Sequence, residues 1–273
     1  MIKFKFLVEN KTNSPGIFAE HGLSIYIQTE EKTILFDTGA SAIFAENAKK
    51  LNVDLRKVDL VVISHGHYDH TGGIPQFCRE NQTAPIYIHK NAFRETYGMK
   101  NGQLQAHTSG IKWSRKEVES RLCLTEGLTP ITENLFISGT IPQTAKDLQP
   151  EQFFEKTEEG SYRPDDMSHE QFLAIKEEGG IFVFSGCSHT GVVNTLNYVN
   201  QIFPGEPIKL LVAGMHLYAC DKATRETVID GVIEQNVHQI MPVHCTGIEG
   251  ICTLKSKLGE NCIIATAGDS YEY

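Results

Sequence analysis

Short apolar runs alternate with stretches of helical spacing along most of the 273-residue chain. Residues 23–39, LSIYIQTEEKTILFDTG, predict a β-hairpin, because two alternating apolar strands flank a charged turn at residues 30–32. Residues 41–51 carry apolar side chains at positions 43, 44, 48 and 51, which predicts a helix with Ser41 as its N-cap. The run VDLVVISH, residues 58–65, is almost wholly apolar, as expected of a strand that is covered on both faces.

The second half of the chain repeats this alternation of strand and helix. Apolar runs bounded by glycine or polar residues predict strands at 179–189, 208–216, 239–247 and 262–268. Helical spacing between these runs predicts helices at 190–203, 224–235 and 248–258. Such alternation is typical of a layered α/β protein.

Four of the predicted strands run directly into a histidine. These residues are His65, His189, His216 and His244. In a layered α/β fold, strands that end on the same side share one edge of the molecule, which is where such folds keep their chemistry. We therefore expect the four histidines to converge on one site.

The segment at about 90–178 interrupts the pattern. Its periodicity is weak, and it contains a polar, acidic stretch at 146–171. A loop of this length inside a compact domain is usually a functional lid or disordered. We expect an insertion with some helix that acts as a lid on a single domain spanning residues 1–273, and not a separate domain.

The stretch VISHGHYDHTGG, residues 62–73, places three histidines and an aspartate within six positions. His65 and His67 are two residues apart, so their side chains project the same way from extended backbone. Asp69 and His70 follow as the chain leaves the strand. Neutral imidazole nitrogen and carboxylate oxygen are the donors that zinc and its first-row neighbours accept. Because so many unpaired polar groups would be costly to bury, the cluster predicts a metal site.

The segment SHGHYDHTGG resembles the HxHxDH signature of the metallo-β-lactamase superfamily. Further landmarks follow the family order, with LFDTG at Asp37, GCSHTG at His189 and PVHCTG at His244. The resemblance implies an α/β fold, the four-layer αβ/βα sandwich, in which two mixed β-sheets pack face to face with helices outside and metals at the shared edge. The segments HGLSIYI, GCSHTGVVNTL, AGMHL and HCTG resemble most the dihydropterin-synthase-like branch of this superfamily.

The resemblance also implies a set of metal ligands. One metal position would use His65, His67 and His189, and a second would use Asp69, His70 and His244. Asp37 matches a family residue that is not a ligand. We expect Asp37 to hydrogen-bond the cluster, although a turn aspartate before glycine explains it equally well.

His216 departs from the family pattern. The superfamily usually has an aspartate at this place, whose carboxylate bridges both metals, whereas Asp221 lies five residues further along this chain. A neutral imidazole has one free lone pair and cannot bridge in that way. His216 would therefore bind one metal, or lie beside the site as an acid, base or substrate contact, or be an ordinary histidine at a strand end. These alternatives leave open whether the site binds one metal ion or two. The candidate catalytic residues are Asp69 and His216. His21 precedes the predicted hairpin in a loop that the resemblance places near the site.

Composition narrows the function classes. The net charge of −9 argues against a nucleic-acid binder, which needs a basic surface. No stretch approaches the roughly 20 apolar residues of a membrane span, and the first residues do not read as a signal peptide. The seven cysteines are scattered, odd in number and form no CxxC motif, so we expect reduced thiols in a cytoplasmic protein.

A basic segment, IKWSRKEVESR at residues 111–121, leaves two interpretations open. Interleaved glutamates favour a solvated helix face. In the alternative, the basic side chains bind an anionic group of the substrate while Trp113 stacks on a flat ring, which would suit a pterin or an aryl phosphate.

The ligand set and the resemblance predict an enzyme. The preferred hypothesis is a metal-dependent hydrolase in which a metal-bound hydroxide attacks an ester, phosphoester or related small-molecule substrate, with Zn²⁺ as the metal and Mn, Fe or Ni as alternatives. The second hypothesis is a dihydropterin-type synthase that joins a pterin to a ribofuranosylaminobenzene 5′-phosphate. A third is a non-hydrolytic metal redox module, as in diiron relatives, which usually carry glutamate where this chain has His67.

Overall fold

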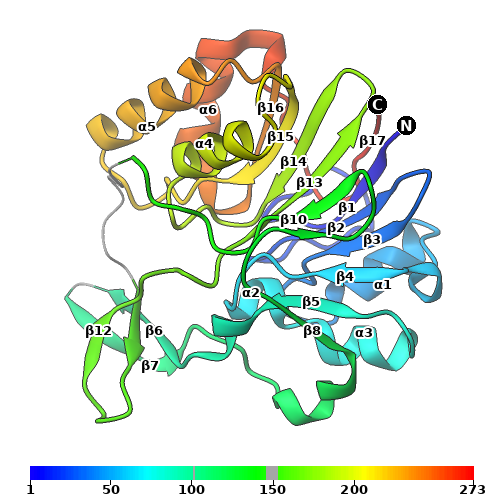
Figure 1. Cartoon of the computed structure of the whole chain (residues 1–273), viewed down its shortest axis with the longest axis vertical. Coiled ribbons are helices and arrows are strands. Elements are labelled where there is room, and N and C mark those ends of the chain that lie inside the picture. The colour runs from blue at the N-terminus through cyan, green and yellow to red at the C-terminus, as the bar shows by residue number, and fades with distance from the viewer. Residues whose placement is uncertain (101, 146–152) are drawn as a thin grey trace.

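The structure is a computed structural model that describes residues 1–100, 102–145 and 153–273. Residues 146–152, the beginning of the expected acidic stretch, lie outside the described part. Within the described part, two large mixed sheets pack against each other and a third, smaller sheet stands to one side of them (Figure 1).

The predicted hairpin is confirmed as an antiparallel pair of strands within the first sheet. The four strands from the second hairpin strand onward run parallel to one another. Its strands, in spatial order, are β17 (Ser270–Glu272), β1 (Lys3–Val8), β2 (Ser24–Gln28), β3 (Thr33–Phe36), β4 (Leu60–Val62), β5 (Ile86–His89) and β8 (Leu122–Thr125).

The second sheet combines three parallel strands with antiparallel neighbours. Its strands, in spatial order, are β16 (Gln239–Val243), β15 (Ile208–Gly214), β14 (Gly180–Ser185), β13 (Phe172–Glu177), β10 (Leu135–Ile137) and β9 (Thr129–Pro130). The strands predicted in the second half up to residue 247 are therefore confirmed, each with shorter bounds.

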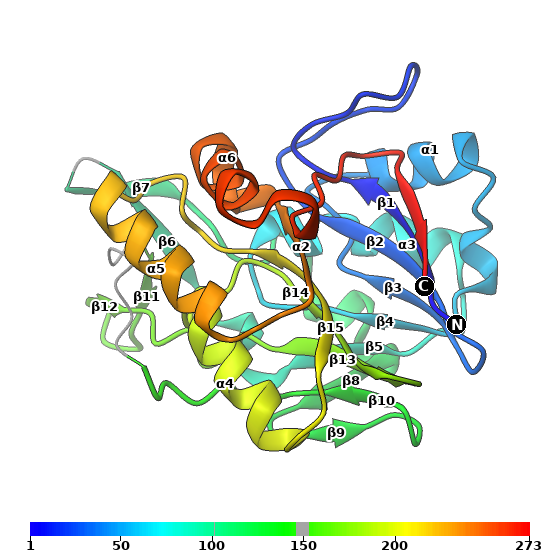
Figure 2. The same ribbon diagram turned by 90° about the horizontal axis from the view of Figure 1, so that it is seen from above.

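Helices cover the outer faces of the two sheets. Figure 2 shows α4, α5 and α6 on one side of the sheet pair and α1 and α3 on the other. The α-helices are α1 (Ile43–Lys50), α2 (Tyr68–Thr71), α3 (Ile74–Glu80), α4 (Val192–Ile202), α5 (Lys222–Glu234) and α6 (Gly247–Leu258). Helix α5 begins at Lys222, two residues before the predicted start, because the Asp221 carboxylate accepts the Thr224 N–H and caps it.

Three apolar clusters fill the spaces between these layers. Alternate residues of one strand belong to different clusters, because successive side chains point to opposite faces of a sheet. In β14, Phe182 and Phe184 pack between the two sheets, whereas Ile181 and Val183 pack under α4 and α5. A third cluster lies under α1 and α3. The predicted four-layer αβ/βα sandwich is confirmed.

The strand predicted at residues 262–268 is wrong. This segment forms only isolated bridges, at Cys262 and at Ala267, and the last strand is β17. The reason is a turn. The Asp269 carboxylate accepts the Thr266 N–H at 2.8 Å, so the backbone bends there before it can pair along its length.

The segment at 90–178 is more closely integrated than the sequence suggests. Strands β8, β9, β10 and β13 of this segment belong to the two large sheets. Its described residues contain 3-10 turns but no α-helix, so the expected helix is wrong for this part. The sheet that remains outside the sandwich consists of β12 (Tyr162–Pro164), β11 (Phe153–Lys156), β6 (Thr96–Lys100) and β7 (Gln103–Thr108). This four-stranded sheet is the part that can cover a site.

Candidate metal centre

The ends of the parallel strands meet at one edge of the sandwich, as the sequence predicts. His65 follows β4 in the first sheet, and His189 follows β14 in the second. The two sheets approach closely here because Gly186 has no side chain, and a Cβ at this position would lie 2.2 Å from Ser64 Oγ. The chain ends of both sheets therefore enclose a common space.

His65, His67 and His189 form the first group of the centre. One ring nitrogen of each lies within 4.8 Å of the others, and all three side chains are buried. In the described part of the chain, the Nε2 atoms of these three residues have no hydrogen-bond partner. Buried imidazole nitrogens without a partner are costly, so a bound cation that accepts their lone pairs fits this group.

Asp37 orients two of the histidines. Its carboxylate accepts hydrogen bonds from His70 Nδ1 at 2.6 Å and from the Ser64 hydroxyl at 2.7 Å. The Ser64 oxygen in turn lies 2.9 Å from His65 Nδ1 and accepts its proton. Both rings are therefore fixed with Nδ1 protonated, which leaves the lone pair on Nε2 free. The expectation that Asp37 hydrogen-bonds the cluster is confirmed.

A second group forms around Asp69. Its Oδ2 atom lies 3.2 Å from His244 Nε2 and 3.2 Å from His21 Nε2. His244 is held by Asn10, whose side-chain oxygen accepts the proton of His244 Nδ1 at 2.7 Å. The side chain of His21 is more than half exposed, so it forms the solvent rim of this group. His70 lies beside this group, with its ring centroid 5.0 Å from that of His244 and its Nε2 atom 3.1 Å from the sulfur of Cys187.

His216 approaches the cluster from the end of β15. Its ring centroid lies 4.4 Å from that of His189, and its backbone has a φ of 47°. This left-handed conformation turns the chain sharply after the strand. The predicted approach of His216 is confirmed, and its bond to one metal stays a prediction. Asp221, which caps α5, does not take the place of a bridging carboxylate.

Burial sets the protonation of these side chains. Burial lowers the pKa of His67 to about 3 and that of His216 to about 4, and it holds the pKa of His189 well below its usual range. Burial opposes the charge on Asp69, but His70, His21 and His244 together outweigh it and keep the Asp69 pKa well below its usual range. At neutral pH His67, His189 and His216 are therefore neutral and Asp69 is ionised, the donor forms that metals bind. His70 is the exception, because Asp37 and Asp69 outweigh its burial and raise its pKa.

Several supporting residues carry no sequence signal. His169 accepts the Gly66 N–H on Nδ1 at 3.2 Å, and its Nε2 atom lies 3.3 Å from Asp165. Glu170 accepts the N–H groups of His189 and Thr190 at 2.7 and 2.8 Å. Each fixes the backbone beside a histidine of the cluster, from a position that is distant in the sequence.

The basic segment at 111–121 is structural in its main contacts. The Trp113 indole N–H donates to the Thr71 carbonyl at 2.8 Å, and its ring packs against Phe93. Arg121 donates to the carbonyls of Asn81 and Ala84. These contacts fix Trp113 and Arg121 within the fold, and the binding of an anionic group by the basic side chains of this segment stays a prediction.

A cavity of about 620 Å³ opens onto the cluster. Its walls include Tyr68, Met99, Phe153 and Tyr218 in addition to the histidines. The Phe153 ring, from β11 of the four-stranded sheet, lies 4.3 Å from the His67 ring and 5.0 Å from the His189 ring. The four-stranded sheet thus supplies an aromatic cover directly over the histidines.

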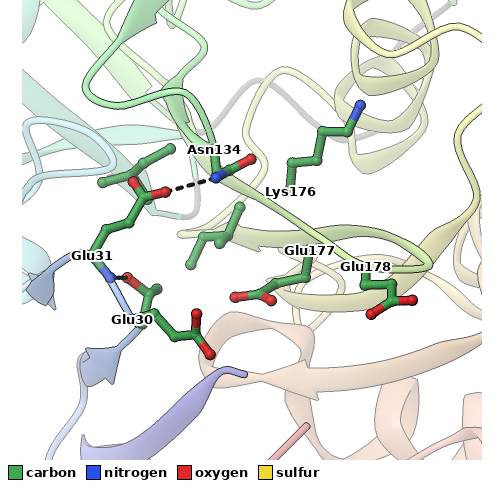
Figure 3. Close-up of a pocket in the computed structure, with 9 residues that line it drawn as sticks. Glu30, Glu31, Asn134, Lys176, Glu177 and Glu178 are labelled. Atoms are coloured by element: carbon green, nitrogen blue, oxygen red, sulfur yellow. Dashed lines mark hydrogen bonds between the residues drawn. The ribbon is translucent and has the colours of Figure 1, made fainter.

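A smaller pocket of about 310 Å³ lies far from the histidines along the strands. It is formed by the β2–β3 turn and the turn that joins β13 to β14 (Figure 3). Figure 3 shows Glu31 bonded to Asn134 there, with Glu30, Glu177 and Glu178 around the same opening. None of its lining residues is a histidine or a cysteine, so it lacks the donors of the larger cavity.

Within the described residues, none of the helices has both the length and the hydropathy that a membrane crossing requires.

Comparison with known proteins agrees with the geometry. A family model described as the metallo-beta-lactamase superfamily matches residues 18–190. The chain is 31% identical to 7,8-dihydropterin-6-methyl-4-(beta-D-ribofuranosyl)-aminobenzene-5′-phosphate synthase of Methanocaldococcus jannaschii, over 87% of this chain and 84% of that protein.

Solved structures show the same fold. One is Tm1679, a metal-dependent hydrolase of the beta-lactamase superfamily, with a TM-score of 0.85 and 29% identity over 100% of this chain and 99% of the other. Another is the metallo-beta-lactamase fold protein YhfI from Bacillus subtilis, with a TM-score of 0.61 and 16% identity over the whole of both chains. Because the matched family model covers more than half of the chain and includes residues 65–70 and His189, the chain belongs to the metallo-beta-lactamase superfamily.

Proposed function

We propose that this chain is a metal-dependent hydrolase of a small ester or phosphoester. The observation that carries the proposal is the set of buried Nε2 atoms without hydrogen-bond partners, which includes His244 as well as the first group, next to a cavity large enough for a small molecule. Such an arrangement is costly unless a cation binds there. One or two ions would bind, with Zn²⁺ preferred and Mn, Fe or Ni as alternatives.

The residues that would hold the metals form two sets. The first position would use His65, His67 and His189, and the second would use Asp69, His70 and His244. His216 would contact one of the two ions. When bound, such ions lower the pKa of a coordinated water to about 7 and polarise the oxygen of the bond to be cleaved.

Asp69 and His216 are the proposed catalytic residues. The Asp69 carboxylate is ionised and partnered by two histidines, so it can accept a proton from a nucleophile held in the cavity. Exposed His21, at 3.2 Å from the same carboxylate oxygen, provides the exit for that proton to solvent. His216 is neutral and lies against the same cavity, where it can contact the reacting group.

The cavity walls indicate what kind of substrate fits. Among the described residues that line the cavity there is no lysine or arginine, whereas Tyr68, Phe153 and Tyr218 present aromatic rings. Lys112 rests on the outer face of the Tyr68 ring at 3.8 Å. We therefore propose a substrate with a flat apolar group that stacks on these rings and a polar group that meets the metals.

A second candidate is a dihydropterin-type synthase. It is favoured by the 31% identity to the archaeal synthase over most of both chains. In that reaction a pterin is joined to a ribofuranosylaminobenzene 5′-phosphate, and the aromatic walls would suit the pterin ring. A small-molecule substrate is common to both candidates. A cytoplasmic setting also belongs to the proposal, supported by the scattered cysteines.

One experiment separates the two candidates. Metal-loaded protein is incubated with a panel of aryl esters, phosphomonoesters and phosphodiesters, and in parallel with a dihydropterin pyrophosphate with and without the aminobenzene co-substrate. The hydrolase proposal predicts turnover of at least one ester without a co-substrate. Pyrophosphate release that requires the aminobenzene, with no ester turnover, would support the synthase instead.

A further inference from the structure

Two buried thiols lie on the floor of the cavity. Cys187 follows β14 and Cys245 follows β16, and only 2% and 3% of their surfaces are exposed. Both side chains line the cavity that opens onto the histidines. The sequence signal for them is weak, because each simply stands close to a histidine.

Cys187 faces the second group of metal-binding candidates. Its Sγ atom lies 3.1 Å from His70 Nε2. It also lies within 4.8 Å of donor atoms of His65 and His70, and, in a second set, of His244 and Cys245. The buried Nε2 atom of His244 lies 3.2 Å from Asp69 Oδ2, so Cys187 stands beside the second group of metal-binding candidates.

Cys245 is engaged differently. Its sulfur accepts the His216 N–H at 3.3 Å, and its thiol donates to the Cys187 carbonyl at 3.6 Å. It also packs tightly, since a Cβ on Gly214 would lie 2.7 Å from its sulfur. Cys245 is therefore tied to the backbone of the neighbouring strands, whereas the sulfur of Cys187 faces a histidine side chain.

Charge gives Cys187 a further reason to bind metal. Of the described residues that line the cavity, Asp69 alone carries a carboxylate. Two divalent ions in this space would be met by very little negative charge. A thiolate would add one negative charge at the side of the second group.

We propose that Cys187 supplies a sulfur ligand to the second metal position, together with His70 and His244. This inference rests on the proposed function, because it requires that the centre binds metal. On coordination the S–H bond of Cys187 breaks, a metal–sulfur bond forms and the proton leaves to solvent. Sulfur favours soft or borderline ions, so the second position selects Zn²⁺, Co²⁺ or Cd²⁺ over Mg²⁺ and Mn²⁺.

The test uses Co²⁺ as the probe. Chelator-treated protein is titrated with Co²⁺ while bound metal is counted and the near-ultraviolet absorption is followed. The wild-type protein is expected to gain a thiolate-to-cobalt charge-transfer band as the second equivalent binds. Cys187→Ser should lose the band and bind the second equivalent at least about tenfold more weakly, with the first equivalent unchanged. Cys245→Ser, the matched buried control, and Cys252→Ser, an exposed one, should keep the band.

The outcomes distinguish this inference from the proposed function. If the wild-type protein binds no cobalt, the proposed function fails. If it binds cobalt without a charge-transfer band, or if the band survives in Cys187→Ser, the sulfur ligand is overturned while the metal centre stands. X-ray absorption of the zinc-loaded proteins is a second measurement, because the wild-type protein is expected to show a sulfur neighbour at about 2.3 Å that is absent in Cys187→Ser. A wild-type shell of nitrogen and oxygen alone, or a sulfur neighbour that persists in Cys187→Ser, would contradict the inference.

Discussion

The Asp37 carboxylate accepts a hydrogen bond from His70 Nδ1 at 2.6 Å, and both side chains are completely buried. The same carboxylate accepts the N–H and the hydroxyl of Ser64. One acidic residue from the end of β3 thus fixes the ring orientation of a histidine 33 positions further along the chain. Both residues act through this contact on the donor atoms that face the cavity.

Replacing Asp37 by asparagine tests this role. Asparagine tolerates the positive φ of 56° at this position, but its amide cannot accept all three hydrogen bonds. We expect metal affinity, measured by competition with a chromophoric chelator, to fall by roughly 10–100-fold. Asp59→Asn, at an exposed carboxylate that accepts the Thr33 N–H, is the control. Equal affinity of Asp37→Asn and the control would refute the orienting role.

Replacing His216 by aspartate tests the place where the chain departs from its family. Aspartate tolerates the left-handed backbone at this position and brings a carboxylate that can bind both metals. We expect tighter binding of the second metal equivalent in a calorimetric titration. His216→Asn, which has the same shape without the charge, should show no such gain. Weaker or unchanged binding in His216→Asp would count against the approach of this residue to a metal.

Replacing Glu170 by glutamine tests a support that the sequence does not reveal. The buried Glu170 carboxylate accepts three hydrogen bonds from the His189–Thr190 segment, and an amide would turn a donor toward one of these donors. We expect the free energy of unfolding in urea to fall by about 1–3 kcal/mol. Exposed Glu178→Gln should change it by less than about 0.5 kcal/mol. An unchanged free energy of unfolding in Glu170→Gln would show that these hydrogen bonds contribute little to stability.

The stability of the metal-free protein should depend on pH. Burial lowers the pKa of His67 from 6.5 to about 3, so the unfolded chain binds a proton below pH 6.5 that the folded chain does not. This group therefore does not reduce the free energy of unfolding above pH 6.5. As the pH falls from 6.5 toward 3, it lowers the free energy of unfolding by about 1.4 kcal/mol per pH unit. Chelator-treated His67→Ala should show a shallower decline in urea titrations between pH 7 and 5. An identical slope would contradict the buried, neutral state of His67.

The features of this protein that could be predicted are those with a local pattern of residues in the sequence. The hairpin, the strands before the histidines and the HxHxDH cluster are encoded in contiguous residues, so each could be identified from the chain alone. The convergence of His65 with His189 also followed, because the ends of parallel strands share an edge. The ordinary rules of strand and helix spacing were sufficient for these features.

Contacts between distant segments explain what was missed. His169 and Glu170 support the centre through hydrogen bonds to backbone groups up to 103 positions away, and no local pattern predicts such contacts. Cys187 stands beside His189 in sequence, but its sulfur reaches His70 in α2, which follows β4 of the other sheet. The strand expected at 262–268 failed because an aspartate side chain imposed a turn on an apolar run.

The most direct measurement is the metal content of His67→Ala. Wild-type protein, His67→Ala and His238→Ala are purified without chelator and examined by elemental analysis, with activity on any ester found in the screen measured on the same samples. His238 immediately precedes β16, whereas the cluster lies beyond the other end of that strand, so it is a matched control from the same chain. We predict that His67→Ala loses metal and activity together while His238→Ala retains both. Full metal content with full activity in His67→Ala would contradict the central claim that this cluster binds the catalytic metal.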